Sequence, residues 1–221
     1  MSEQVSSIKP ILGNRSDVAI GVLIILYTVG VLGTLFNVHD QFLLLTPLNL
    51  LISLGIVLYF HPRWSIATVL LLIACYTIGF LAEVYGVQTG QLFGDYGYGP
   101  VLGWQVQETP LMIGVNWVML VYCVGTSVNQ FMPRALWGLK VLMGAILMVS
   151  LDVLIEPVAM HYDFWSWEGN IIPMQNYIGW FLVSLIQFAC FFWIESQTKN
   201  KVAFVLLLLQ FAFFWILGLN W

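Results

Sequence analysis

The chain has 221 residues, of which 60% are hydrophobic and 8% are charged, and its mean hydropathy is +0.90. A soluble domain carries roughly 25% charged residues, so this composition excludes an ordinary soluble globular protein. The apolar residues instead form runs of about twenty, which is the length that a helix needs to cross a hydrocarbon core of roughly 30 Å.

Seven such runs follow one another along the chain. In lipid each run has to be helical, because unpaired backbone groups find no water there. The predicted spans are residues 17–37, 42–60, 65–86, 110–130, 135–157, 174–195 and 202–220. We therefore predict an all-α polytopic membrane helix bundle, with residues 1–221 in a single integral membrane domain.

Charged residues between the spans are sorted by sign. All Lys and Arg residues lie on the face that carries the amino terminus, namely Lys9, Arg15, Arg63, Arg134, Lys140, Lys199 and Lys201. The loops of the other face carry only acids, namely Asp40, Asp95, Glu108, Asp163 and Glu168. By the positive-inside rule, the amino terminus is cytoplasmic and the carboxyl terminus external.

Three acids fall within predicted spans, near their outer ends. Asp152 and Glu156 are four residues apart, so on a helix they share one face, with Cβ atoms about 5–6 Å apart. Glu83 lies at a similar depth in the third span, and Asn116 and Asn176 enter from the outer ends of the fourth and sixth spans. Four helices are thus predicted to place polar groups at one level.

These acids have two interpretations. Each could lie at the interface and extend its carboxyl group outward. Three acids and two amides at one depth, without a basic partner nearby, favour a buried functional cluster instead. Carboxyl groups that share a poorly solvated site tend to keep a proton between them, so that a protonated acid lies beside an ionised base.

Two other residues are interpreted from their local sequence. Pro157 is expected to end or kink the fifth helix. Glu195 lies four residues before Lys199 at the cytoplasmic end, and we expect the two to form a solvated ion pair.

Aromatic residues gather in the two long connections, 87–109 and 158–173. An aromatic belt at the membrane interface is one explanation. The other is a segment that caps an apolar pocket, since Phe93–Pro100 is both glycine-rich and aromatic. The three histidines form no ligand box and no nucleotide-binding glycine pattern occurs, so we expect no metal and no other cofactor.

Several motifs, taken in order, resemble the CruF-type carotenoid biosynthesis family over about residues 80–180. They are Glu83, Phe93-Gly94-Asp95-Tyr96-Gly97-Tyr98, Pro110 to Trp117, Asp152 to Pro157, Trp165-Ser166-Trp167, and Pro173 to Trp180 with Asn176 and Gly179. The resemblance implies a carotenoid 1,2-hydratase, which adds water to the terminal double bond of an acyclic end group of the γ-carotene, lycopene or bisanhydrobacterioruberin type. It also implies a multi-pass protein of a bacterial or archaeal cell membrane.

Hydration of such an end needs an acid that protonates C2, a base that takes a proton from water, and aromatic faces beside the cation at C1. The candidate catalytic residues are Glu83, Asp152, Glu156 and Asp95, the last on a loop that water can reach. The candidate substrate-binding residues are Tyr96, Tyr98, Asn116, Trp117, Trp165, Trp167, Asn176 and Trp180.

Two alternatives remain at this point. A carotenoid cyclase forms the same cation and quenches it with an internal alkene. A proton-coupled transporter or lipid-binding membrane protein could use the carboxylates as a relay, although an odd number of helices without an internal repeat disfavours a transporter. The expected partners are membrane lipid, a carotenoid and other carotenoid-pathway enzymes, and no nucleic acid.

The charge distribution gives a first prediction. A reporter fused to the amino terminus should read cytoplasmic, and one fused after Trp221 should read external. Activity of both reporters on the same side of the membrane would contradict the seven-helix topology.

Overall fold

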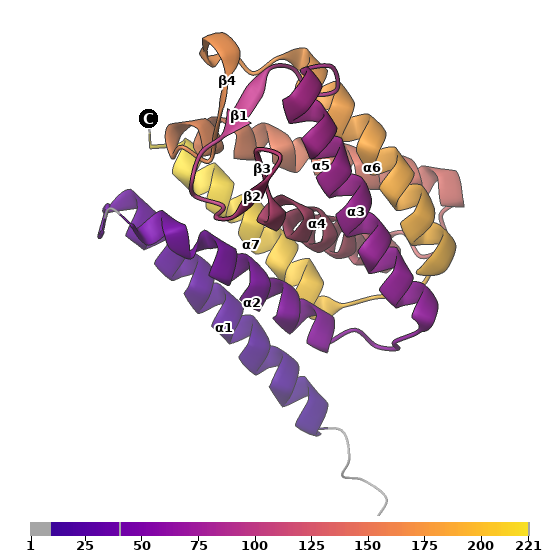
Figure 1. The fold of residues 1–221 in the computed structure, drawn as a ribbon. Helices are drawn as coiled ribbons and strands as arrows, with labels where there is room; N and C mark the ends of the chain where they lie inside the picture. The colour runs from indigo at the N-terminus through magenta and orange to yellow at the C-terminus, as the bar shows by residue number, and fades with distance from the viewer. Residues whose placement is uncertain (1–9, 40, 221) are drawn as a thin grey trace, which may run out of the picture.

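In the computed structural model, residues 10–39 and 41–220 are described, and they form seven helices long and apolar enough to cross a membrane (Figure 1). The helices are α1 (Pro10–Leu35), α2 (Thr46–Tyr59), α3 (Ile66–Thr89), α4 (Leu111–Phe131), α5 (Trp137–His161), α6 (Met174–Ile194) and α7 (Lys201–Gly218). A short 3-10 helix, Phe42–Leu45, extends α2 at its start. The predicted all-α polytopic bundle is confirmed, and most predicted boundaries lie within a few residues of the observed ones.

Helix α4 is the centre of the bundle, and α2, α3, α5, α6 and α7 all pack on it. In an 18-residue apolar stretch of α4, 78% of the residues are buried inside the protein, compared with 44% or less in the corresponding stretch of every other span. Figure 1 shows α1 and α2 together on one side of this centre and α3 and α6 on the other. Helix α1 packs mainly on α7.

Local signals set several helix ends. The Ser65 hydroxyl accepts a hydrogen bond from the Thr68 amide at 3.0 Å and caps α3. Asn200 caps α7, because its side-chain oxygen accepts from two backbone amides of the first turn. Helix α3 ends at Gly90, whose φ of +66° is left-handed, and a side chain there would collide with the Asp95 carboxylate.

The two long connections are not simple loops. Strand β1 (Tyr96–Tyr98) of the first pairs antiparallel with β4 (Trp165–Trp167) of the second, with Tyr96 opposite Trp167 and Tyr98 opposite Trp165. Because side chains alternate along a strand, these four rings share one face of the ribbon. Strands β2 (Gln105–Val106) and β3 (Thr109–Pro110) form a separate hairpin. The sequence predicts none of these strands.

Successive helices run in alternating directions, so the β1–β4 ribbon lies at one end of the bundle, here called the strand end (Figure 1). The connections that carry Arg63, Arg134 and Lys199 lie at the opposite end, as the charge pattern predicts. The orientation of the strand end in a membrane stays a prediction. Of the charges used for it, Lys9 and Asp40 lie outside the described residues.

Pro157 was expected to end or kink the fifth helix, and the first of these expectations is wrong, since α5 continues through it to His161. Proline removes one backbone donor and weakens the turn before it. The turn after it is buried, with Val158 and Ala159 1% and 2% exposed, so packing favours continuation of the helix beyond Pro157.

The expected solvated pair of Glu195 with Lys199 is also wrong. Glu195 is buried, and its carboxylate accepts hydrogen bonds from the hydroxyls of Thr68 and Thr198. The Asn129 amide donates to the Glu195 carbonyl at 2.6 Å, which ties α4 to the end of α6. Thr68 and Asn129 are distant in sequence, so spacing within one helix could not show them as partners.

Candidate active site

The three carboxyl groups predicted to cluster are all buried at the strand end. Glu83 on α3 is 2% exposed, and Asp152 and Glu156 on α5 are 0% and 1% exposed. Acids that extended outward to the interface would be accessible, so the structure favours a buried cluster over that interpretation. Burial of charge at this depth is costly unless hydrogen bonds satisfy it.

Aromatic hydrogen-bond donors surround Glu83. Its Oε2 accepts from the hydroxyls of Tyr96 at 2.6 Å and Tyr98 at 2.7 Å. Its Oε1 accepts from the indole Nε1 of Trp117 at 3.1 Å. Three donors to one carboxylate favour its ionised form, since that form only accepts hydrogen bonds.

The phenols themselves stay protonated. Burial first, and then the charge of Glu83, raises the pKa of both Tyr96 and Tyr98 well above the ordinary value for a phenol. Both hydroxyls therefore keep the proton that they donate to Glu83. They belong to β1, so the pairing of β1 with β4 sets their position.

Glu156 is held by the other strand of the ribbon. Its Oε2 accepts from the indole Nε1 of Trp165 at 3.0 Å and of Trp167 at 2.6 Å. An indole N–H can only donate, so these two contacts select an acceptor oxygen. The Asn176 amide nitrogen of α6 donates to the remaining oxygen, Oε1, at 3.0 Å.

Asp152 shares that amide with Glu156. The Asn176 nitrogen also donates to Asp152 Oδ2, at 2.9 Å, and therefore joins the two carboxyl groups. The other oxygen, Oδ1, is buried and has no hydrogen-bond partner among the described residues. A buried polar atom in this state needs a proton of its own or a water molecule to avoid the cost of desolvation.

Aromatic rings also pack around the three carboxyl groups. Trp117 stacks on Trp180 of α6 with ring centroids 4.2 Å apart and an angle of 21° between the planes. The ring centroids of Tyr96 and Trp167 lie 4.8 Å apart. Such π faces attract a cation. The cluster thus combines negative carboxyl groups with surfaces that stabilise positive charge.

The structure brings together ten of the twelve residues singled out from the sequence. The ten are Glu83, Tyr96, Tyr98, Trp117, Asp152, Glu156, Trp165, Trp167, Asn176 and Trp180. Asp95 lies apart, because its side chain is exposed and packs beside Gly90. Asn116 also lies apart and lines a cavity on another side of α4. Adjacent residues on a helix point about 100° apart, so Asn116 and Trp117 face different neighbours.

Phe93 is a structural element of the site that was not among the predicted site residues. It is 1% exposed and packs edge-on against Tyr96, with ring centroids 6.2 Å apart. Gly86 and Gly179 admit the ring, because a Cβ at either position would lie within 2.7 Å of it. Its place in a glycine-rich aromatic segment was the available signal. Among the described residues, no group of three or more His, Cys, Asp or Glu side chains could hold a metal ion.

Together, the fold and the site define a multi-pass membrane protein with buried carboxyl groups enclosed by indole and phenol side chains. The chain belongs to the carotenoid biosynthesis protein family, whose family model matches residues 44–221. The resemblance seen in the sequence is thereby confirmed at the level of the family. The match includes every residue of the cluster and leaves out α1. Searches of curated proteins and of solved structures give no match.

Proposed function

We propose that the protein is a carotenoid 1,2-hydratase, which adds water to the terminal C1–C2 double bond of an acyclic carotenoid end group. One observation supports the proposal above all. In a member of a carotenoid biosynthesis family, two buried carboxyl groups share one amide donor and are enclosed by aromatic faces. Acid, base and cation-stabilising surface are the requirements of alkene hydration.

We assign the acid to Asp152. Its Oδ1 is free of other hydrogen bonds and can carry the proton, whereas Oδ2 is occupied by Asn176. As that O–H bond breaks, a C–H bond forms at C2 of the substrate and the positive charge moves to C1, a tertiary carbon. The charge develops near carboxylates and rings that are already in position, so little reorganisation is needed.

We assign the base to Glu156. Donors from Trp165, Trp167 and Asn176 stabilise its anion. A water oxygen bonds to C1 while one of its protons passes to Glu156, which gives a tertiary alcohol. After the product leaves, a water molecule carries the proton from Glu156 back to Asp152, which restores both groups with one water consumed. Glu83 stays ionised and lowers the energy of the cation electrostatically.

Replacing a carboxyl group of the cluster with an amide should greatly slow turnover, because an amide can neither give nor take the proton. Asp152→Asn and Glu156→Gln keep the shape of the side chain, and each should lower the rate by about 10²–10⁴. Glu83→Gln should also slow the reaction, because it removes charge beside the cation. The measurement is chromatographic analysis of pigments in a lycopene-producing host, normalised to protein in the membrane.

Glu108→Gln is the matched control, because Glu108 is exposed in the β2–β3 turn at the same end of the bundle. It should leave turnover unchanged. Near-normal turnover in all three cluster variants would remove this cluster from the mechanism.

The origin of the product hydroxyl separates hydration from its alternatives. In ¹⁸O-labelled water the tertiary alcohol should carry the label, and in deuterated water one deuterium should appear at C2. The reaction should proceed without molecular oxygen, reductant, nucleotide or added metal. Mass spectrometry of the product measures both labels.

Other label patterns would contradict the proposal. A hydroxyl derived from molecular oxygen would refute hydration. A cyclised product with deuterium but no ¹⁸O would indicate a cyclase. No conversion of any acyclic carotenoid by well-expressed protein would favour a transporter or lipid-binding protein.

A further inference from the structure

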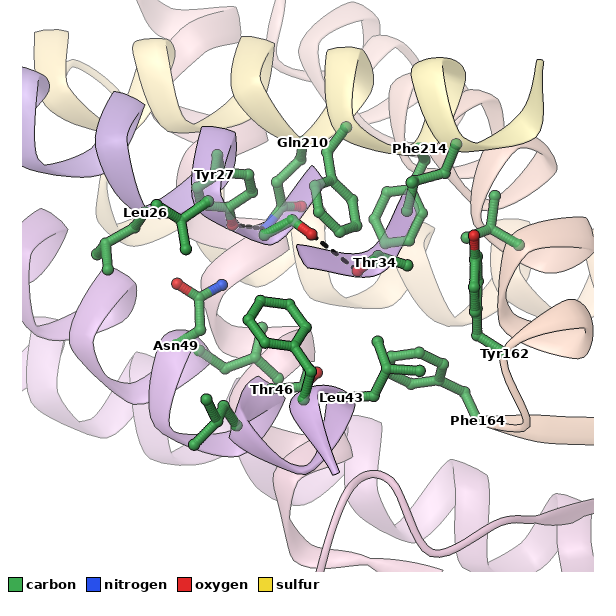
Figure 2. Close-up of a pocket in the computed structure, with 18 of the residues that line it drawn as sticks. Leu26, Tyr27, Thr34, Leu43, Thr46, Asn49, Tyr162, Phe164, Gln210 and Phe214 are labelled. Carbon is green, nitrogen blue, oxygen red and sulfur yellow. Dashed lines mark hydrogen bonds between the residues drawn. The ribbon is translucent and has the colours of Figure 1, made fainter. Parts of the chain in front are cut away.

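A second feature of the strand-end half of the bundle is an apolar cavity of about 240 Å³ between α1, α2, α5 and α7 (Figure 2). Figure 2 shows Leu26 and Thr34 of α1 on one side of it and Leu43 and Thr46 on another. Leucine, isoleucine, valine and phenylalanine side chains make up most of the lining. The cavity takes no part in the hydrogen bonds that hold the carboxyl groups.

The cavity continues toward those carboxyl groups. A smaller cavity of about 60 Å³ adjoins it, and the two share the lining residues Thr46, Leu50, Asn116, Phe164 and Phe214. Trp165 lines the smaller cavity but not the larger one. The indole of Trp165 donates to Glu156. The two cavities therefore form one passage that ends at a wall of the carboxylate cluster.

Two polar groups that line the passage are satisfied within the protein. The Thr34 hydroxyl donates to the Gly30 carbonyl at 2.8 Å, and the Gln210 amide donates to the Tyr27 hydroxyl at 3.2 Å. Neither needs a polar ligand. The side-chain oxygen of Asn49 is buried without a partner among the described residues, and it can accept from a water molecule beside an apolar ligand.

One side of the passage opens toward lipid. Val29 of α1 and Leu48 and Ile52 of α2 line the cavity, yet they are 52%, 55% and 38% exposed on the surface of the bundle. Exposed apolar side chains on membrane-spanning helices face the hydrocarbon region. A ligand dissolved in lipid can therefore enter sideways between α1 and α2.

We propose that this passage binds the apolar chain of the carotenoid substrate, which enters between α1 and α2 and places its terminal double bond at Trp165 beside Glu156. The identity of the ligand rests on the proposed function. The apolar lining fits a methyl-branched polyene, and the open side lets the rest of the chain stay in lipid. Helix α1 lies before the matched residues 44–221, so a helix outside the family match completes the passage.

Thr46 is the best position for a test, because it lines both cavities. Thr46→Trp should block the passage where they join, and Leu43→Trp should narrow the larger cavity from a second direction. Leu51→Trp is the matched control, since Leu51 is 50% exposed on α2 and does not line the cavity. All variants are made in the Glu156→Gln background, which by the proposed function leaves bound lycopene unconverted. The readout is lycopene retained per protein after purification from a lycopene-accumulating host, measured by visible absorbance.

Each blocking variant should retain about tenfold less lycopene than Glu156→Gln alone, a loss of about 1.4 kcal/mol in binding free energy. Leu51→Trp should retain as much as Glu156→Gln alone, because it leaves the passage open. Undiminished retention by both blocking variants, or no retention by Glu156→Gln alone, would overturn the passage.

The same experiment separates the two proposals. If Glu156→Gln retains lycopene and the blocking variants lose it, but the wild-type protein forms no hydrated product, the passage stands and the hydratase assignment fails. If the tryptophan variants do not accumulate, Thr46→Cys replaces them. Bound lycopene should slow maleimide labelling of Thr46→Cys but not of Leu51→Cys, and equal labelling of both would contradict the passage.

Discussion

Three carboxyl groups are buried within the membrane-spanning bundle, and the structure depends on the hydrogen bonds that satisfy them. Every Lys and Arg belongs by sequence to the opposite end, and the hydrogen-bond donors to Glu83, Asp152 and Glu156 are neutral phenol, indole and amide groups. An unsatisfied charge in this position would cost several kcal/mol. Neutral donors stabilise carboxylate ions without neutralising them, so the negative potential of the cluster is preserved.

This constraint explains why the two long connections form paired strands. The donors to Glu83 and Glu156 come largely from β1 and β4, so the site forms only when these segments, far apart in sequence, pair with each other. Small residues let the aromatic groups approach, as at Gly79, where a side chain would collide with Trp117. Helix α4 supplies Trp117 to the cluster from one face and Asn116 to the passage from another. Site and passage therefore share one central helix.

Much of this follows from sequence, because span length, charge sorting and four-residue spacing report on single helices. The membrane spans and the acids at one depth were predicted on that basis. What could not be predicted is which way each helix faces. Helix α5 is apolar around most of its circumference, so the pattern does not fix its rotation. The burial of Glu195, the separation of Asn116 from the cluster and the β1–β4 pairing all depend on contacts between distant segments.

The central claim is that neutral donors of the paired strands stabilise the buried carboxylates, and a double-mutant cycle between Trp167→Phe and Glu156→Gln tests it most directly. Unfolding free energies of the purified variants come from sodium dodecyl sulfate titrations followed by far-ultraviolet circular dichroism. The lost ring volume is the same in both backgrounds, so it cancels in the cycle. We expect Trp167→Phe to destabilise the wild type by about 1 kcal/mol or more beyond its effect in the Glu156→Gln background. Effects that add within about 0.5 kcal/mol would contradict the account.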